Sequence, residues 1–333
     1  MSERIPVIFD TDIGIDDAYA LLLAAGNPTL KLLGITTCFG NTSLDNCNRN
    51  ALQICELLGL DVPVAAGARK ALMLPERKFD TNSPFVVHGH DGLGDISHRL
   101  PTPTKKLEDI SAVELMAKLV RESEEKVVLI PVGPLTNIAI FLMTYPELHE
   151  RIDGIALMGG AAYGGNALPR GEANIVADPE AAQIVFQSGL RIMMAGLDVT
   201  NVAYITKEDR ELFRIVGGRV GELYCDMVEV YAGFHARSAG FPERTDPADS
   251  NMYGAPNMHD SVAVAWLIDP SIVKTVPANV QVDLDGKYTR GCTATDLRQG
   301  PRAPKPNAMV GMEIDREAFV KLHTDAFRRF ADR

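Results

Sequence analysis

The sequence contains one Trp, few aromatic residues and five cysteines among 333 residues. The cysteines stand at positions 38, 47, 55, 225 and 292 and form no Cys-x-x-Cys pair. Because their number is odd, we interpret them as reduced thiols rather than as a disulfide framework. An apolar leader and a stretch long enough to span a bilayer are also missing. We therefore predict a cytoplasmic protein without a membrane partner.

Basic residues are outnumbered by acidic ones. The chain carries 33 Lys and Arg against 44 Asp and Glu, which gives a net charge of -11 at pH 7. This balance argues against a basic surface for nucleic acid or anionic lipid, and it leaves a small neutral substrate unaffected. With 46% apolar and 23% charged residues, the composition is that of an ordinary globular protein.

Four aspartates lie close together near the start of the chain. Asp10, Asp12, Asp16 and Asp17 follow the apolar run at 5–9, which predicts a buried parallel strand, and they precede a predicted helix. Two like charges about 4 Å apart repel by about 4 kcal/mol at an effective dielectric near 20, so the group needs a counter-charge. Oxygen ligands without His or Cys favour calcium or magnesium. Helix capping is the alternative, and it accounts for one or two of the four acids.

Strand and helix signals alternate along the rest of the chain, which favours an α/β fold with an open, mostly parallel sheet flanked by helices. No low-complexity linker interrupts the pattern, so we predict a single domain over residues 1–333. The expected strands are 5–9, 31–37, 61–66, 126–131, 152–158, 190–196, 278–282 and 308–314. The expected helices include 17–26, 111–123, 206–216, 218–239, 261–268 and 317–330.

Polar residues follow several of these strands, at the sheet edge where open parallel sheets bind ligands. Asn41 follows the strand at 31–37, and Glu172 and Asn174 end a Gly-rich loop after 152–158. The loop lacks the Gly-Lys-Ser/Thr of a phosphate cradle. We expect Glu172 and Asn174 to point to the same side of an extended segment, where they can bind a polyol. A plain turn role is the alternative for Asn41.

Other polar residues have a structural alternative beside the functional one. Asp198 either supports the site or caps the region before the helix at 206–216, and we expect the capping role. Tyr231 and His235 either belong to the core or contact a nucleobase beneath a mobile flap at 240–256. Capping is the alternative for Asp260, which precedes the helix at 261–268.

The stretch Asp10-Thr11-Asp12-Ile13-Gly14-Ile15-Asp16-Asp17-Ala18 resembles the signature of the inosine-uridine type nucleoside hydrolases, with Ile13 in place of the usual Pro. Further segments resemble the same family in order and spacing. They are Gly40-Asn41, His88-Gly89, Val132-Gly133-Pro134-Leu135-Thr136-Asn137, Met158-Gly159-Gly160, Glu172-Ala173-Asn174 and His259-Asp260. The resemblance implies a Rossmann-like core.

The resemblance also assigns roles to individual residues. It implies that Ca²⁺ is held by Asp12, Asp17, the carbonyl of Val132 and Asp260. The usual residue at position 132 is Thr, but any residue supplies a carbonyl. Asp12 would be the base that activates a metal-bound water, and His259 the acid for the leaving base. Asp10 would support the ligands. The ribose and base would contact Asp16, Asn41, His88, Met158, Asn166, Glu172, Asn174 and Asp260.

The implied activity is calcium-dependent hydrolysis of the N-glycosidic bond of ribonucleosides of the uridine, cytidine and inosine class, in nucleoside salvage. Relatives are commonly oligomeric, so a homodimer or homotetramer is expected. The presence of both His88 and His259 resembles the broad or pyrimidine-preferring branches. Two alternatives stay open: a non-catalytic nucleoside-binding protein of the same fold, and an Asp-based phosphohydrolase. The latter needs a Lys and a second acidic pair that the sequence does not place, and Ile13-Gly14-Ile15 breaks its motif.

Overall fold

The computed structural model describes residues 4–76, 86–238 and 255–333, except for the side chains at 234–238. Within these residues a mixed sheet runs in the order β3-β2-β1-β4-β5-β6-β9-β7-β8. All pairs from β3 to β9 are parallel, and β7 pairs antiparallel with both β9 and β8. The predicted open, mostly parallel sheet is therefore confirmed. The strands are β1 (Ile5–Thr11), β2 (Leu30–Thr37), β3 (Val64–Ala66), β4 (Val127–Pro131), β5 (Ile152–Met158), β6 (Ile192–Ala195), β7 (Val273–Val282), β8 (Thr293–Asp296) and β9 (Ala308–Ile314).

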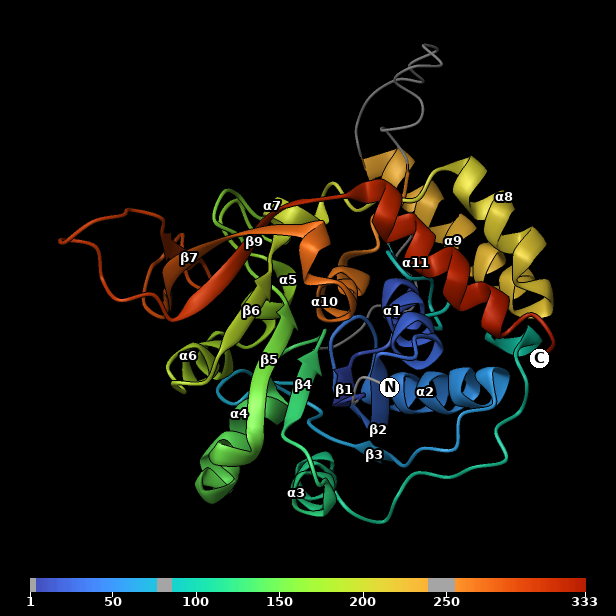
Figure 1. Cartoon of the computed structure of the whole chain (residues 1–333), viewed down its shortest axis with the longest axis horizontal. Coiled ribbons are helices and arrows are strands. Elements are labelled where there is room, and N and C mark those ends of the chain that lie inside the picture. The colour runs from blue at the N-terminus through green and yellow to red at the C-terminus, as the bar shows by residue number, and fades with distance from the viewer. Residues whose placement is uncertain (1–3, 77–85, 239–254) are drawn as a thin grey trace, which may run out of the picture.

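Helices cover both faces of the sheet (Figure 1). One layer contains α1, α2, α10 and α11, with α8 and α9 outside it, and the opposite layer contains α3, α4 and α6. No helix of the described residues is long and apolar enough to cross a membrane. The helices are α1 (Ile15–Gly26), α2 (Leu44–Leu58), α3 (Ala112–Glu122), α4 (Thr136–Thr144), α5 (Ala173–Ala177), α6 (Pro179–Phe186), α7 (Leu197–Thr200), α8 (Lys207–Val216), α9 (Gly218–Ser238), α10 (His259–Ile268) and α11 (Arg316–Arg329).

The central strands are mostly apolar because each of their faces lies against a helix layer. In β1, the side chains of Val7 and Phe9 belong to one core cluster, whereas Ile8 belongs to the other. Successive side chains of a strand point to opposite faces, so a strand buried on both sides needs apolar residues at every position. The run at 5–9 therefore encodes a central strand.

The chain reverses its direction of travel across the sheet at β1. After β1 the chain continues to β2 and β3 on one side, and β4 then pairs with the other side of β1. Open α/β sheets bind ligands outside the carboxyl ends of the strands at such a switch point. The aspartates that follow β1 and the turn that follows β4 both lie at this position.

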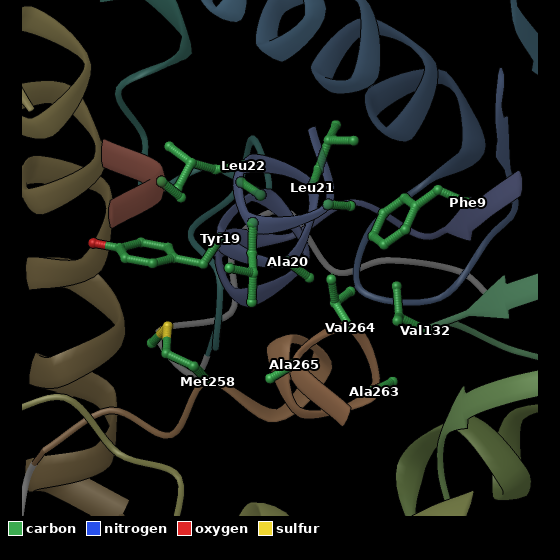
Figure 2. Packing of buried hydrophobic residues seen from close by; sticks show 14 of the residues in the cluster. Phe9, Tyr19, Ala20, Leu21, Leu22, Val132, Met258, Ala263, Val264 and Ala265 are labelled. Carbon is green, nitrogen blue, oxygen red and sulfur yellow. The ribbon is translucent and has the colours of Figure 1, made fainter. Parts of the chain in front are cut away.

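Helices α1 and α10 pack side by side against this part of the sheet. Figure 2 shows Ala20 of α1 and Val264 and Ala265 of α10 near this contact. Every residue of α10 from Asp260 to Leu267 is buried, and Trp266 lies in the core as predicted. The packing brings the first turns of two helices distant in the sequence to one place.

Local sequence signals fix the starts of some helices as expected. The Ser111 hydroxyl accepts from the Glu114 N–H in the predicted capping box of α3. Asp178 caps α6, with Pro179 at its first position. Each cap satisfies an N–H group that the helix leaves without a partner.

His323 ties α11 to the start of α10. Its Nδ1 lies 3.0 Å from the Phe319 carbonyl oxygen, and its Nε2 lies 3.0 Å from the Ser261 hydroxyl oxygen. A carbonyl only accepts hydrogen bonds, so Nδ1 carries the proton and Nε2 accepts from Ser261. Burial lowers the pKa of His323 to about 4, which keeps the ring neutral.

We expect His323 to make the fold less stable as the pH falls. The unfolded ring takes up a proton near pH 6.5, whereas the folded ring stays neutral down to about pH 4. Its contribution is therefore complete above pH 6.5 and is lost as the pH falls toward 4, by about 3 kcal/mol in all. The free energy of unfolding in urea is measured for the wild type and for His323→Gln across this pH range. The difference between the two proteins gives the contribution of His323. A difference that does not change with pH would contradict it.

Candidate active site

The turn between β1 and α1 gives Asp17 two roles. Its Oδ2 accepts from the Gly14 N–H at 2.8 Å. This bond is the helix cap that was the alternative to a metal-binding role for these aspartates. The Thr11 hydroxyl donates to Oδ1 of the same carboxylate at 2.5 Å. Asp17 is fully buried, so these bonds hold it rigidly at the first turn of α1. Helix capping thus accounts for one of the roles of Asp17, but it does not account for the neighbouring aspartates.

Asp260 joins Asp16 and Asp17 in one buried group. Each of the three offers a carboxylate oxygen, and these oxygens all lie within 4.8 Å of one another. The carboxyls of Asp12 and Asp260 also lie close enough to Asp17 to influence its pKa. Met258 is the N-cap of α10 and no side chain caps it, so capping by Asp260, the alternative from the sequence, is excluded. Residues from opposite ends of the chain therefore share one cluster.

The environment of the cluster favours a neutral or cation-bound state. Burial raises the pKa of Asp12, Asp16 and Asp260 well above the usual range, and the charge of a neighbouring aspartate raises each further. Asp12 Oδ1 and Asp16 Oδ1 are buried without a hydrogen-bond partner among the described residues. Among the described residues, no Lys or Arg lines the cavity that lies beside this cluster. An all-oxygen donor set with unpartnered oxygens fits a hard divalent cation.

Asp12 is held in a narrow space between two glycines. Its Oδ2 accepts from the Asn41 N–H at 2.6 Å, and the Asn41 side-chain amide donates to Asp17 Oδ2 at 2.9 Å. A Cβ atom at Gly133 would lie 2.6 Å from Asp12 Oδ1, and one at Gly40 would also overlap the carboxylate. The glycines of the Gly40-Asn41 and Val132-Gly133-Pro134 segments thus leave room for the Asp12 carboxylate. Asn41 lies beside the aspartates as expected.

Asp10 lies beneath the cluster and is itself buried. It accepts from the Thr36 hydroxyl at 2.6 Å and from the Asn137 side-chain amide at 2.8 Å. Burial raises the pKa of Asp10 to about 6. Asn137 also donates to the Thr37 carbonyl and accepts from the Ala68 N–H, so it joins three segments below the site. This role of Asn137 was not predicted from the sequence.

A cavity of about 910 Å³ opens above the cluster. Every site residue predicted from the sequence lines it, except Asp12 and Asp17. These two lie behind its wall, with 1% and 0% of their surface exposed. The predicted lining residues are Asp16, Asn41, His88, Val132, Met158, Asn166, Glu172, Asn174, His259 and Asp260, and the lining also contains Phe39, Asn201, Tyr231 and Asn257.

Glu172 and Asn174 line the cavity, but the predicted extended segment is wrong. Glu172 is the N-cap of α5, and its carboxylate accepts from the N–H groups of Asn174 and Ile175 as well as from Gly160 at 2.9 Å. The Asn174 side chain donates to the carbonyls of Val132 at 2.9 Å and Met158 at 3.2 Å. A carboxylate followed by free N–H groups favours a helix start over a strand.

Asn166 belongs to the Gly-rich loop that precedes α5. Its side-chain oxygen accepts from the Ala173 N–H at 2.9 Å, which joins the loop to the start of the helix. Burial raises the pKa of the neighbouring Glu172.

His88 forms the wall of the cavity above α1. Its Nδ1 accepts from the Ile15 N–H at 3.1 Å and lies 3.8 Å from Asp16 Oδ1. The Tyr231 ring stacks on it at a centroid distance of 5.1 Å and an angle of 24°. Tyr231 and Tyr224 on α9 both belong to the buried core, and Tyr231 also lines the cavity. The His235 side chain and most of the predicted flap at 240–256 lie outside the described residues.

His259 also lines the cavity, at the first position of α10. Its Nδ1 lies 2.7 Å from the Thr200 hydroxyl oxygen. The expectation for Asp198 is wrong: Thr206 caps α8, and Asp198 instead accepts from the N–H groups of Ala162 and Tyr163 in the Gly-rich loop. Neither Thr200 nor this use of Asp198 carries a signal in the sequence.

Comparison with known proteins relates the whole chain to one group of enzymes. A family model described as inosine-uridine preferring nucleoside hydrolase matches residues 7–321. The pyrimidine-specific ribonucleoside hydrolase RihA of Enterobacter sp. (strain 638) is 43% identical over 331 residues, 99% of each chain. The purine-preferring ribonucleoside hydrolase from Gardnerella vaginalis has a TM-score of 0.87 at 35% identity, covering 98% of this chain and 99% of its own. The plant nucleoside hydrolase PpNRh1 has a TM-score of 0.86 at 30% identity, with the same coverage.

We expect the stability of the cation-free protein to fall as the pH rises. The aspartates of the cluster hold protons more tightly when folded than when unfolded, because burial raises their pKa values. Stability is therefore lost as the pH rises from about 4 through the folded pKa values. A divalent cation replaces these protons, so the increase in Tm on adding Ca²⁺ or Mg²⁺ over EDTA should be larger at pH 8 than at pH 5.5. Thermal unfolding at both pH values measures it.

Asp260→Asn gives the matched variant for this measurement. It removes one charge from the cluster, so in EDTA at pH 8 its Tm should equal or exceed that of the wild type, while its response to the cation shrinks. Asp325→Asn on α11 is the control and should respond to the cation as the wild type does. The idea fails if neither cation changes the Tm of the wild type at pH 8.

Proposed function

The chain belongs to the inosine-uridine preferring nucleoside hydrolase family, and from this premise we propose that it hydrolyses pyrimidine ribonucleosides in a Ca²⁺-dependent reaction. Members of this family are N-ribosyl hydrolases, and so is this chain. The finer proposal covers the metal, the residue roles and the preferred base. This proposal rests on one observation: a single cavity has oxygen ligands at one end and two imidazoles on its walls.

We assign the cation to Asp12, Asp17, Asp260 and the carbonyl of Val132. The unpartnered Asp12 Oδ1 supports this set, and so does the cluster of buried oxygens around Asp17 and Asp260. Asp16 belongs to the same cluster but also lines the cavity, so it is placed to contact both the ion and a sugar hydroxyl. When bound, Ca²⁺ would keep these carboxylates ionised and acidify a nearby water.

The ribose is assigned to the polar lining near α5. Asn41, Asn166, Glu172 and Asn174 present amide and carboxylate groups there, and hydrogen bonds within the protein hold all four in place. A polyol bound by fixed donors and acceptors needs little further ordering to react. The sulfur of Met158 is 3.4 Å from the Asn174 amide and adds an apolar surface beside the sugar.

In the reaction, Asp12 removes a proton from the attacking water and His259 gives a proton to the departing base. The sugar carbon becomes positively charged as the N-glycosidic bond breaks, as in glycoside hydrolysis generally. Carboxylates fixed in advance around this carbon stabilise that charge without reorganising. No Ser or Cys nucleophile is required.

The pyrimidine preference rests on the base end of the cavity and on similarity. The stacked pair of His88 and Tyr231 offers a polar edge and a flat apolar surface for the base. The 43% identical relative is a pyrimidine-specific enzyme, whereas the purine-preferring one shares 35%. We further propose one domain over residues 1–333, a cytoplasmic location and a homodimer or homotetramer, as expected from the sequence.

We expect Asp12→Asn to lower the rate of ribose release from uridine by about 10²- to 10⁴-fold, the usual contribution of a general base. Its folding should not suffer, because the substitution removes a buried charge. Asp45→Asn, at an exposed aspartate paired with Arg69, is the matched control and should keep full activity. A reducing-sugar assay with thermal unfolding of each variant measures both. An active Asp12→Asn enzyme would remove Asp12 from the base role.

Uridine and cytidine should have a kcat/KM at least about tenfold above that of inosine, which corresponds to roughly 1.4 kcal/mol of transition-state binding. Uridine 5′-phosphate should not react, because the described lining contains carboxylates but no Lys or Arg to bind a phosphate. Ribose and phosphate release are measured for each compound. Equal or faster cleavage of inosine would contradict the pyrimidine preference, and phosphate release would indicate a phosphohydrolase.

A further inference from the structure

We infer that Thr200 is a positioning residue for the leaving-group proton: it holds the His259 imidazole by Nδ1 so that Nε2 delivers the proton to the departing base. This inference rests on the proposed function. It goes further by naming the group that orients the acid and the nitrogen that carries the proton. The contact that carries it is the 2.7 Å separation of Thr200 Oγ1 and His259 Nδ1.

The two residues come from helices that are fixed to each other. Thr200 is the last residue of α7 and is fully buried, whereas His259 begins α10. The segments beside them exchange two backbone hydrogen bonds, from the Met258 N–H to the Ala203 carbonyl at 2.9 Å and from the Ile205 N–H to the Pro256 carbonyl at 3.1 Å. These backbone hydrogen bonds therefore fix the distance between the Thr200 hydroxyl and the His259 ring.

Helix α7 is also tied to the ribose end of the cavity. The Leu197 N–H donates to the Gly160 carbonyl at 2.9 Å, and Asp198 accepts from the Ala162 and Tyr163 N–H groups at 2.7 and 3.0 Å. The same Gly-rich loop continues to Asn166 and Glu172. One short helix thus relates the position of the proton donor to the position of the sugar whose bond must break.

A hydroxyl is a suitable partner for a ring that changes its protonation state. The His259 imidazolium donates its Nδ1 proton to Thr200 Oγ1 and presents its Nε2 proton to the base nitrogen. As the C1′–N bond breaks, its electron pair goes to the base, the base nitrogen takes the Nε2 proton, and the water oxygen bonds to C1′ after losing a proton to Asp12. The neutral ring keeps its Nδ1–H bond to Thr200, so its orientation survives the transfer.

Leaving groups of different basicity separate this role from a structural one. We expect Thr200→Val to lower kcat for uridine by about ten- to a hundredfold, part of the usual contribution of a general acid, with KM changed less than about threefold. Hydrolysis of p-nitrophenyl riboside should change less than about threefold, because p-nitrophenolate leaves without a proton. Thr200→Ser keeps the hydroxyl and should restore most of the uridine activity.

Two further variants complete the test. Thr324→Val removes a buried hydroxyl from α11, away from the cavity, and should leave both substrates unaffected. Adding Thr200→Val to His259→Ala should cause no further loss for uridine, because Thr200 acts through the ring. If Thr200→Val does not fold, Thr200→Ala replaces it in both backgrounds.

An equal loss for both substrates, a loss that Thr200→Ser does not restore, or no loss with uridine would overturn the role of Thr200 while leaving the proposed function intact. A wild-type enzyme that releases neither ribose from uridine nor p-nitrophenol from the riboside would overturn the proposed function, and the inference with it.

Discussion

The packing of α1 against α10 places acidic first turns from opposite ends of the chain in contact, and the rest of the site depends on this. Asp16, Asp17 and Asp260 meet inside the protein, where burial raises the pKa of all three and the charge of a neighbouring carboxylate raises that of Asp16 and Asp260 further. The positive ends of two helix dipoles offset part of this repulsion. The remainder needs protons or a cation. The packing of α1 against α10 that stabilises the fold is therefore also the reason why the buried aspartates need a counter-charge.

The fold could be predicted because its signals are local. Apolar runs such as 5–9, with caps such as Ser111 and Asp178, define strands and helices from neighbouring residues alone, and the structure confirms them. The switch point at β1 then gathers segments that the sequence separates by more than two hundred residues, from Asp12 to Asp260. Asn41 could be placed beside the aspartates because parallel strands deliver the residues at their ends to one edge of the sheet.

The groups that orient the site were not predictable in this way. Thr200, Asp198 and Asn137 act through contacts between segments distant in the sequence, and each is a common residue in an ordinary local context. Glu172 was assigned the wrong local structure because a period of two fits a strand, whereas its carboxylate starts a helix. Tyr231 resembles the core residues of α9 in spacing, and only the position of His88 distinguishes it.

The charges that make the site costly to fold are the same ones that suit its chemistry. In the proposed function, a neutral nucleoside enters a cavity whose described lining holds carboxylates and no Lys or Arg, and it gains little from them while it is uncharged. In the reaction that we propose, the sugar becomes cationic as the N-glycosidic bond breaks, and the same carboxylates would attract it and bind the transition state more strongly than the substrate. The carboxylates whose crowding is unfavourable in the resting protein are thus the groups placed to stabilise the charged transition state.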